Sequence, residues 1–131
     1  INVVACVFKK NEKILITSRP ETKNFSGFFE FPGGKVEKDE CLLEALDREI
    51  YEELGIRLDF SKIYYLNNYR ILKHNISLHF FLCLRWFGKV KNKEKQILQW
   101  IVPEELNNYK LLKSNESFKV FLNNFIFPTT H

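Results

Sequence analysis

Residues 33–56 read GGKVEKDECLLEALDREIYEELGI. Apolar side chains recur in the second half of this stretch at intervals of three or four residues, which predicts an amphipathic helix beginning near Glu40. The residues of the predicted buried stripe are Leu43, Leu46, Ile50 and Leu54. Gly55 follows at a position that commonly ends a helix, and the pair Gly33 and Gly34 predicts a turn with exposed backbone ahead of it.

Three carboxylates lie beside the apolar stripe of this helix. Glu49, Glu52 and Glu53 are spaced i, i+3 and i+4, so their side chains can converge on one point. Their mutual repulsion would be relieved by a hard divalent cation such as Mg²⁺, which favours carboxylate and phosphate oxygens. A solvated acidic face neutralised by Arg48 explains the same spacing equally well. The helix alone leaves both interpretations open.

The segments on either side of the helix predict strands. Residues 2–8 and 13–18 are rich in Val and Ile around a polar turn, and residues 63–72 and 76–87 form a second, aromatic-rich pair, so two hairpins are expected. Residues 28–31 and 97–102 predict shorter extended pieces, residues 103–106 a short helix, and residues 115–125 an amphipathic helix. The order predicts an α/β or α+β fold in which helices cover a sheet.

Composition indicates a soluble, globular chain of about one domain. The 131 residues are 45% hydrophobic and carry a formal charge of +4, which a solvated basic surface explains. Cys6, Cys41 and Cys83 are odd in number and widely spaced, so we expect buried free thiols, a cytoplasmic location and no zinc site. No segment predicts a membrane span or a signal peptide.

The arrangement of residues 34–56 resembles the Nudix box. It consists of Gly34, five residues, Glu40, seven residues, Arg48-Glu49-Ile50, one residue, Glu52-Glu53, one residue and Gly55-Ile56. The resemblance implies a single Nudix hydrolase domain over residues 1–131, folded as an α/β/α sandwich with a mixed β-sheet between helices. It also implies a Mg²⁺ cofactor, for which Mn²⁺ may substitute, held by the catalytic residues Glu49, Glu52 and Glu53 and by the carbonyl of Gly33. Gly34, Glu40 and Arg48 match structural positions of the box.

A second likeness is carried by Thr17-Ser18-Arg19, Glu30-Phe31-Pro32-Gly33-Gly34-Lys35, Ile76 to Trp86, Glu94, Trp100 and Ser114-Asn115-Glu116. In type and order these residues resemble the MutT-type 8-oxo-dGTP diphosphatases within that family, so the likeness extends over most of the chain. This likeness implies that Glu94 is a further catalytic metal ligand. It also implies a set of substrate-binding residues, namely Arg19, Asn24, Glu30, Phe31, Pro32, Gly33 and Asn115. Four of these residues have an ordinary alternative: Arg19 and Glu94 could be solvated loop charges, Phe31 could belong to the core, and Asn115 could be a helix N-cap.

The resemblance therefore predicts a Mg²⁺-dependent nucleoside triphosphate pyrophosphohydrolase. Its expected substrate is 8-oxo-dGTP or a related oxidised dNTP, converted to the monophosphate and pyrophosphate so that the nucleotide pool is cleansed and mutation prevented. The expected partner is this small nucleotide, bound by a monomer that forms no stable nucleic acid complex and meets no membrane. The alternatives are a Nudix enzyme for another dNTP or an RNA 5′ triphosphate, and a non-catalytic nucleotide- or RNA-binding module.

Overall fold

The computed structural model describes residues 1–19 and 27–112 and contains a mixed β-sheet with one α-helix against it. The sheet runs in the order β3-β2-β1-β7-β6, with β4 paired to β1 and β9 paired to β2. Its strands are β1 (Asn2–Lys10), β2 (Lys13–Ser18), β3 (Phe29–Glu30), β4 (Gly33–Lys35), β6 (Ile63–Ile71), β7 (Ile76–Cys83) and β9 (Leu98–Ile101). β1 and β7 are parallel and the other pairs are antiparallel, so the mixed sheet expected from the sequence is confirmed.

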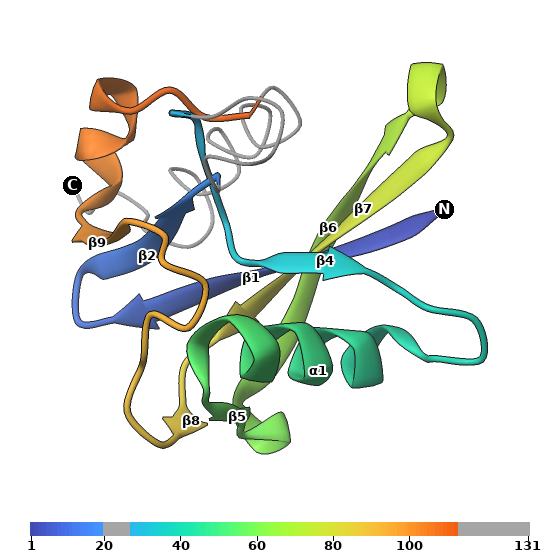
Figure 1. Cartoon of the computed structure of the whole chain (residues 1–131), viewed down its shortest axis with the longest axis horizontal. Coiled ribbons are helices and arrows are strands. Elements are labelled where there is room, and N and C mark those ends of the chain that lie inside the picture. Colours follow the sequence, from blue (N-terminus) through green and yellow to red (C-terminus); the bar gives the residue numbers. More distant parts are fainter. Residues whose placement is uncertain (20–26, 113–131) are drawn as a thin grey trace, which may run out of the picture.

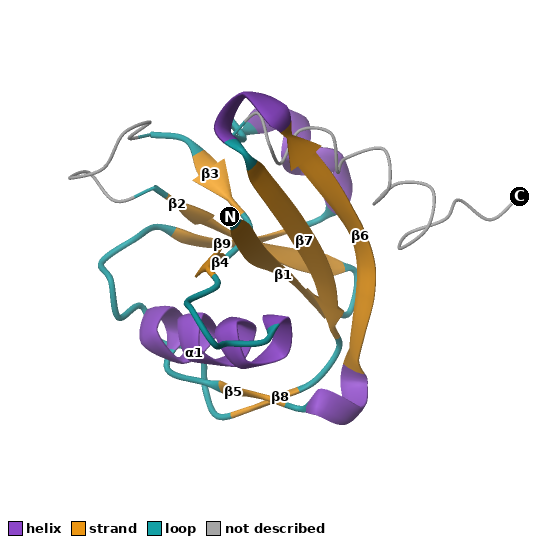
Figure 2. Cartoon of the chain, turned by 90° about the vertical axis from the view of Figure 1, so that its right-hand side faces the viewer, coloured by secondary structure: helices purple, strands orange, loops and turns teal. Residues whose placement is uncertain are grey.

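The remaining elements lie around this sheet. They are helix α1 (Leu42–Leu54), the small sheet of β5 (Arg57–Leu58) and β8 (Trp86–Phe87), and the 3₁₀ turns η1 (Phe60–Lys62), η2 (Leu72–His74) and η3 (Pro103–Asn108). Figure 2 shows α1 under one face of the sheet, with β5 and β8 beyond it. No helix in the described part of the chain has the length and apolarity needed to span a bilayer.

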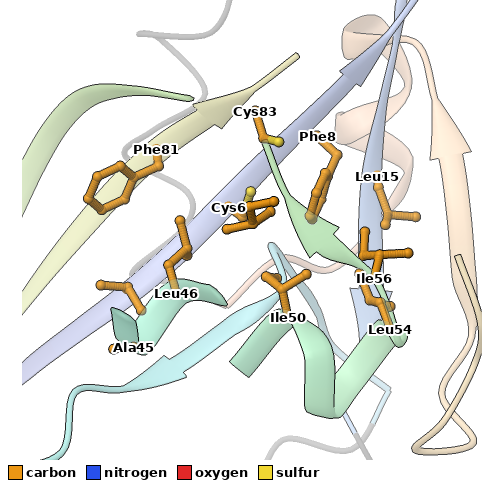
Figure 3. Close-up of a cluster of buried hydrophobic side chains, with 12 residues drawn as sticks. Cys6, Phe8, Leu15, Ala45, Leu46, Ile50, Leu54, Ile56, Phe81 and Cys83 are labelled. Atoms are coloured by element: carbon orange, nitrogen blue, oxygen red, sulfur yellow. The ribbon is translucent and has the colours of Figure 1, made fainter. Parts of the chain in front are cut away.

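β1 is the centre of the core because both of its faces are covered. Val4, Cys6 and Phe8 point toward α1, where they pack with Leu46, Ile50, Leu54 and other apolar residues in one cluster (Figure 3). Ala5 and Val7 point the other way, into a second cluster with residues of β2, β7, β9 and η3. Alternation along a strand sends successive side chains to opposite faces, so the continuous apolar run at the start of the chain supplies both clusters.

Helix α1 is the predicted amphipathic helix, but its first residue and one of its buried side chains differ from the prediction. It begins at Leu42 rather than near Glu40, and the Glu44 carboxylate accepts a hydrogen bond of 2.9 Å from the Cys41 N–H at its start. Leu43, expected in the stripe, is 38% exposed, while Leu42 packs on the core. Cys41 is also exposed, contrary to the expectation of three buried thiols, because it precedes the helix instead of facing the sheet.

The C-terminal end of α1 is as the sequence predicts. Gly55 has φ +69°, in the left-handed region that glycine adopts without strain, and its N–H donates to the Tyr51 carbonyl at 2.9 Å. Cys6 and Cys83 are free and buried, also as expected.

The exposed turn predicted at Gly33 and Gly34 is wrong, because both residues lie in β4. Antiparallel pairing places Gly33 opposite Ala5 and Gly34 opposite Val4. A Cβ on Gly33 would lie 1.9 Å from the backbone oxygen of Val4, so glycine is required here by close packing of two backbones rather than by a turn. β4 thereby lies between β1 and α1 (Figure 1).

Both predicted hairpins are confirmed with small changes of length. The second strand of the later hairpin ends at Cys83, because Trp86 and Phe87 pair with β5 instead of continuing along β6. The short helix expected after residue 102 is η3. The helix predicted over residues 115–125 lies outside the described residues.

Candidate active site

A cleft of about 750 Å³ opens beside β4 and the C-terminal half of α1. The acidic and polar part of its lining, the acidic end, consists of Glu30, Glu49, Glu52, Glu53, Glu94 and Gln96, together with Arg19 and Lys35. The apolar part, the apolar end, consists of Val3, Ala5, Phe31, Ile71, Ile76, Leu78 and Leu112. The sequence predicted most of the acidic end but only Phe31 of the apolar end, because the other apolar residues come from β1, the β6–β7 hairpin and the segment after η3.

Glu53 is the most deeply buried carboxyl group of the acidic end. It is only 5% exposed, and its Oε2 accepts a hydrogen bond from the Gly33 N–H at 3.3 Å. Burial, together with the nearby charges of Glu30 and Glu94, raises the pKa of Glu53 to about 8. Negative charge at Glu53 is therefore poorly stabilised by the surrounding protein.

Glu49 is partly buried and is held by Arg48. The Arg48 Nη1 donates to Glu49 Oε1 at 2.9 Å, and the same atom lies 3.5 Å from Glu52 Oε1. Burial raises the pKa of Glu49, whereas Arg48 opposes that rise. Glu52 is the most exposed of the three helix carboxylates, with 57% of its side-chain surface accessible.

Arg48 is itself fixed from the opposite side by Glu40. The Nε and Nη2 atoms of Arg48 donate to the two oxygens of Glu40 at 2.7 and 3.0 Å, and Nη2 also donates to the Lys35 carbonyl at 2.9 Å. Hydrogen bonding from Arg48 lowers the pKa of Glu40 to about 2, so this pair stays ionised. The loop before α1 is thus tied to the helix by one guanidinium group.

Gly34 leaves the room that Glu49 occupies. A Cβ at Gly34 would lie 2.3 Å from the carboxyl carbon of Glu49, so even alanine would displace that side chain. The residues expected to have structural roles, Gly34, Glu40 and Arg48, are therefore all in contact with Glu49 or with its support.

Glu94 reaches the same cleft from a separate loop. Backbone bonds join this loop to the end of α1, with the Lys91 N–H donating to the Leu54 carbonyl at 2.8 Å and the Lys93 N–H to the Glu53 carbonyl at 3.3 Å. The charge of Glu94 contributes to the raised pKa of both Glu49 and Glu53. Its place beside the helix carboxylates favours the ligand interpretation over that of a solvated loop charge.

Of the expected substrate residues, Arg19, Glu30, Phe31 and Gly33 line the cleft, whereas Pro32 is not among its lining residues. Arg19 Nη1 pairs with Glu30 Oε2 at 3.2 Å, and both side chains line the cleft. Phe31 is 3% exposed and faces both the cleft and the second core cluster, so the two interpretations of this residue are compatible. Pro32 contributes its carbonyl to a 2.8 Å bond from the Cys6 N–H. Asn24 and Asn115 lie outside the described residues.

The acidic end fits a divalent cation by its chemistry. Over residues 1–19 and 27–112, no three Asp, Glu, His or Cys groups are arranged so that they already surround one point. Glu49 is turned to Arg48, and Glu53 to the Gly33 N–H. Five Glu side chains nevertheless share one cleft, and repulsion from Glu94 contributes to the raised pKa of Glu49 and Glu53. A hard cation would offset that repulsion, and carboxylate oxygens are its preferred ligands.

Comparison with models of protein families decides to which family this chain belongs. The NUDIX domain model matches residues 1–124. The chain belongs to the Nudix family. Among Nudix relatives, an "8-oxo-dGTP diphosphatase" of Buchnera aphidicola subsp. Schizaphis graminum is 37% identical over 108 residues, which are 80% of this chain and 79% of the relative. A "CTP pyrophosphohydrolase" of Escherichia coli K12 is also 37% identical, over 105 residues that are 80% of this chain and 78% of the relative.

Solved Nudix structures agree with this assignment. A MutT structure, from a study of the Aliivibrio salmonicida and Vibrio cholerae proteins, superimposes with a TM-score of 0.80 at 29% identity. The match covers 93% of this chain and 97% of that one. The chain is accordingly a MutT-like Nudix hydrolase that acts on phosphoric anhydrides, in an enzyme family that uses divalent cations and small nucleotide substrates.

Sequence reasoning missed one polar residue of the acidic end, Gln96. It lies two residues after Glu94, is 6% exposed and lines the cleft. A neutral side chain in a Lys-rich segment carries no charge or spacing signal, so only its burial reveals it.

Proposed function

We propose that this protein is a Mg²⁺-dependent nucleoside triphosphate pyrophosphohydrolase, acting as a cytoplasmic, single-domain monomer. The observation that carries the proposal is the composition of one cleft, which is lined by five carboxylates and by an apolar wall. The carboxylates would hold a cation that offsets the charge of a triphosphate, and the apolar wall could receive a nucleobase.

In this proposal Glu49, Glu52, Glu53 and Glu94 hold the metal, together with the carbonyl of Gly33. When bound, Mg²⁺ offsets charge on the phosphate oxygens and favours ionisation of water. Arg48 orients Glu49, and the Gly33 N–H orients Glu53. Arg19, paired with Glu30 at the cleft wall, is placed to contact phosphate or purine acceptor atoms.

The reaction is an attack of water on a phosphorus atom of the bound triphosphate, the β phosphorus by resemblance to MutT-type enzymes. A bond forms between the water oxygen and the β phosphorus, and the bond from the β phosphorus to the oxygen that bridges it to the α phosphorus breaks. The products are a nucleoside monophosphate and pyrophosphate. A cleft carboxylate accepts the proton that the water loses. The excess of carboxylates over cationic partners at this end makes such a base available.

We propose 8-oxo-dGTP as the preferred substrate. Support comes from the 37% identity to an 8-oxo-dGTP diphosphatase across most of both chains. CTP is the second candidate, because a CTP pyrophosphohydrolase is equally identical over a similar span. Hydrolysis of 8-oxo-dGTP would remove an oxidised precursor from the nucleotide pool.

The test is pyrophosphate release in Mg²⁺ from 8-oxo-dGTP, dGTP, CTP, dCTP and a 5′-triphosphorylated RNA, compared by kcat/KM. We expect 8-oxo-dGTP to lead by at least about ten-fold, a difference of about 1.4 kcal/mol in transition-state stabilisation. A lead for CTP would replace the substrate while retaining the reaction. Absence of turnover with every member would overturn the proposed reaction.

A further inference from the structure

The loop that carries Glu94 is docked on the C-terminal end of α1 (Figure 1). The Lys91 N–H donates to the Leu54 carbonyl at 2.8 Å, and the Lys93 N–H donates to the Glu53 carbonyl at 3.3 Å. The last carbonyls of an α-helix have no partner within the helix, so these two bonds satisfy acceptors that would otherwise need water. The loop therefore continues the hydrogen bonding of α1 with residues from a distant part of the sequence.

One of these bonds links two residues of the acidic end. Glu53 lines the cleft, and its main-chain carbonyl accepts the bond from Lys93. Lys93 directly precedes Glu94, which lines the same cleft. The path from Glu53 to Glu94 thus contains a single hydrogen bond and is otherwise covalent. The position of the Lys93 backbone on α1 therefore determines where Glu94 enters the cleft.

The side chain of Lys93 is held on the outer surface of α1 by an aromatic ring. Its Nζ lies 4.8 Å from the centroid of the Tyr51 ring, a cation–π contact. The stems of Lys93 and Lys91 also cover Gly55, where a Cβ would lie 3.2 Å and 3.4 Å from their Cδ atoms. Both ammonium groups are favoured at this place by the negative end of the helix dipole. Tyr51 is 41% exposed, so its ring supports the loop rather than the core.

The same ring contacts a second cation that does not belong to the loop. Cζ of Arg57, in β5, lies 3.8 Å from the Tyr51 centroid, and its Nη1 pairs with Asp47 Oδ2 at 3.1 Å. Loss of the Arg57 side chain would remove a cation from the ring but leave the contact with Lys93 in place. Arg57 is therefore a matched control for the loop contact.

The far end of the Glu94 loop is fastened separately, to β2. The Ser18 N–H donates to the Ile97 carbonyl at 2.9 Å, and the Ile97 N–H donates to Ser18 Oγ at 2.8 Å. Glu94 thus lies between one attachment on β2 and another on α1. The ring of Tyr51 reinforces the attachment on α1.

We propose that Tyr51 is a positioning residue that holds the Glu94 loop on α1 and thereby places the Glu94 carboxylate beside that of Glu53. The inference rests on the proposed role of these two carboxylates in holding the cation. Tyr51 acts through Lys93 and does not touch the reacting atoms. Without the ring, the loop leaves the helix end more often, and Glu94 is less well placed when the cation binds.

The first experiment measures loop docking in the metal-free protein. Protection of the amides of residues 91 and 93 against hydrogen exchange, followed by NMR with a chelator present, reports how often the loop leaves α1. We expect Tyr51→Leu to lower both protection factors about two- to five-fold, as for the loss of an exposed cation–π contact. Tyr51→Phe retains the ring and Arg57→Met retains the loop contact, so both should keep wild-type protection.

Two results of this experiment would overturn the proposal. Wild-type protection in Tyr51→Leu would mean that the ring does not hold the loop. An equal loss of protection in Arg57→Met would mean that the surface of α1 as a whole, rather than the contact with Lys93, is responsible.

The second experiment tests whether loop docking reaches the cation. Mn²⁺ binding is measured by electron paramagnetic resonance without nucleotide. We expect Tyr51→Leu to weaken it about two-fold or more, because part of the binding free energy must then order the loop. The same substitution made in Glu94→Gln should have no further effect, since Tyr51 acts through Glu94. An unchanged affinity, or the same loss with and without Glu94, would make Tyr51 a structural residue only and overturn the proposal.

Kinetics give a third readout, with the best nucleotide of the substrate panel. We expect Tyr51→Leu to lower kcat about five-fold through misplacement of Glu94, and to raise the Mg²⁺ concentration that gives half-maximal rate. Tyr51→Phe should restore kcat to within about two-fold of wild type, because the ring face is retained. An equal loss in Tyr51→Phe would assign the effect to the hydroxyl group and contradict the proposal.

Two provisions keep the outcome decisive. If Tyr51→Leu does not give the wild-type circular dichroism spectrum, Lys93→Met replaces it, because it removes the same contact from the loop side and is held to the same protection factors. If the wild type hydrolyses no nucleotide, the proposed function fails, but hydrogen exchange and Mn²⁺ binding still decide whether Tyr51 positions the Glu94 loop.

Discussion

The two ends of the cleft are built in different ways. Three carboxylates of the acidic end, Glu49, Glu52 and Glu53, come from α1, with Glu30 added from β3 and Glu94 from one loop. The apolar end takes its residues from β1, β6 and β7, with Phe31 and Leu112 added from segments between elements. Spacing along one helix can therefore specify most carboxylates of the acidic end, whereas the apolar end depends on the packing of the whole sheet.

This difference separates reaction type from substrate choice. Changes at the acidic end should lower kcat for every nucleotide, because phosphate chemistry is common to all of them. Changes at the apolar end should act on KM and on the ratio between nucleotides, because only the base differs. Variants at each end test whether that separation holds.

Glu53→Gln should have the largest effect on catalysis. It removes the buried charge at the centre of the acidic end while retaining the shape of the side chain, so we expect kcat to fall at least about 10³-fold, as when an essential group is lost. Glu104→Gln, which alters an exposed carboxylate in η3, is the matched control and should retain wild-type kcat. A kcat of Glu53→Gln above about one tenth of the wild-type value would show that Glu53 is not a catalytic residue.

The same substitution should stabilise the metal-free protein at high pH. A carboxyl group whose folded-state pKa is raised, here from 4.5 to about 8, binds its proton more tightly when folded. The contribution of Glu53 to the free energy of unfolding is therefore greatest below its unfolded pKa. It falls as pH rises toward 8, by at most about 1.4 kcal/mol per pH unit. Gln has no proton to lose, so Glu53→Gln should avoid that loss.

Thermal unfolding with a chelator at pH 5.5 and 7.5 measures this effect. We expect the wild-type Tm to fall by several degrees more than that of Glu53→Gln across this interval. Added Mg²⁺ should restore the wild type and leave the variant unchanged. Parallel changes of Tm in the two proteins would show that Glu53 does not carry a buried, unfavourable charge.

The features that could be predicted from the sequence also differ between the acidic and the apolar end of the cleft. The helix, both hairpins and the carboxylates Glu49, Glu52 and Glu53 follow from apolar periodicity and from i, i+3, i+4 spacing, which are local properties. The strand β4 was missed because two glycines ordinarily signal a turn, and only their close approach to β1 explains them. Leu43 was misplaced because periodicity does not fix the phase of a helix against a sheet to within one residue.

The adjacent glycines of β4 offer a sharper comparison within the acidic end. Gly34→Ala should retain the fold but lower kcat about ten-fold, because the atoms nearest to its Cβ would belong to the movable end of the Glu49 side chain. Gly33→Ala should instead reduce stability, because its Cβ would meet the Val4 backbone, which cannot move without breaking the sheet. Circular dichroism and kcat per folded molecule distinguish the two losses, and the same loss of stability in both variants would contradict this assignment.

Ile76→Ala should have the smallest effect, at the other end of the cleft. Ile76 lines the apolar wall at the start of β7 and is only partly buried, so its truncation removes contact surface without emptying the core. Loss of about 40 Å² of apolar contact, at about 25 cal/mol per Å², corresponds to roughly 1 kcal/mol or a five-fold rise in KM. Leu72→Ala, in the neighbouring η2 turn and 81% exposed, is the matched control and should leave KM unchanged.

The informative quantity for Ile76→Ala is the pattern across substrates. If the aliphatic wall contacts the base, KM should rise while kcat stays within about two-fold, and the ratio of kcat/KM between purine and pyrimidine triphosphates should change. A uniform fall in kcat for all nucleotides would mean that this wall supports the carboxylates instead. The two ends of the cleft would then be structurally coupled, and residues in another part of the chain would have to determine substrate choice.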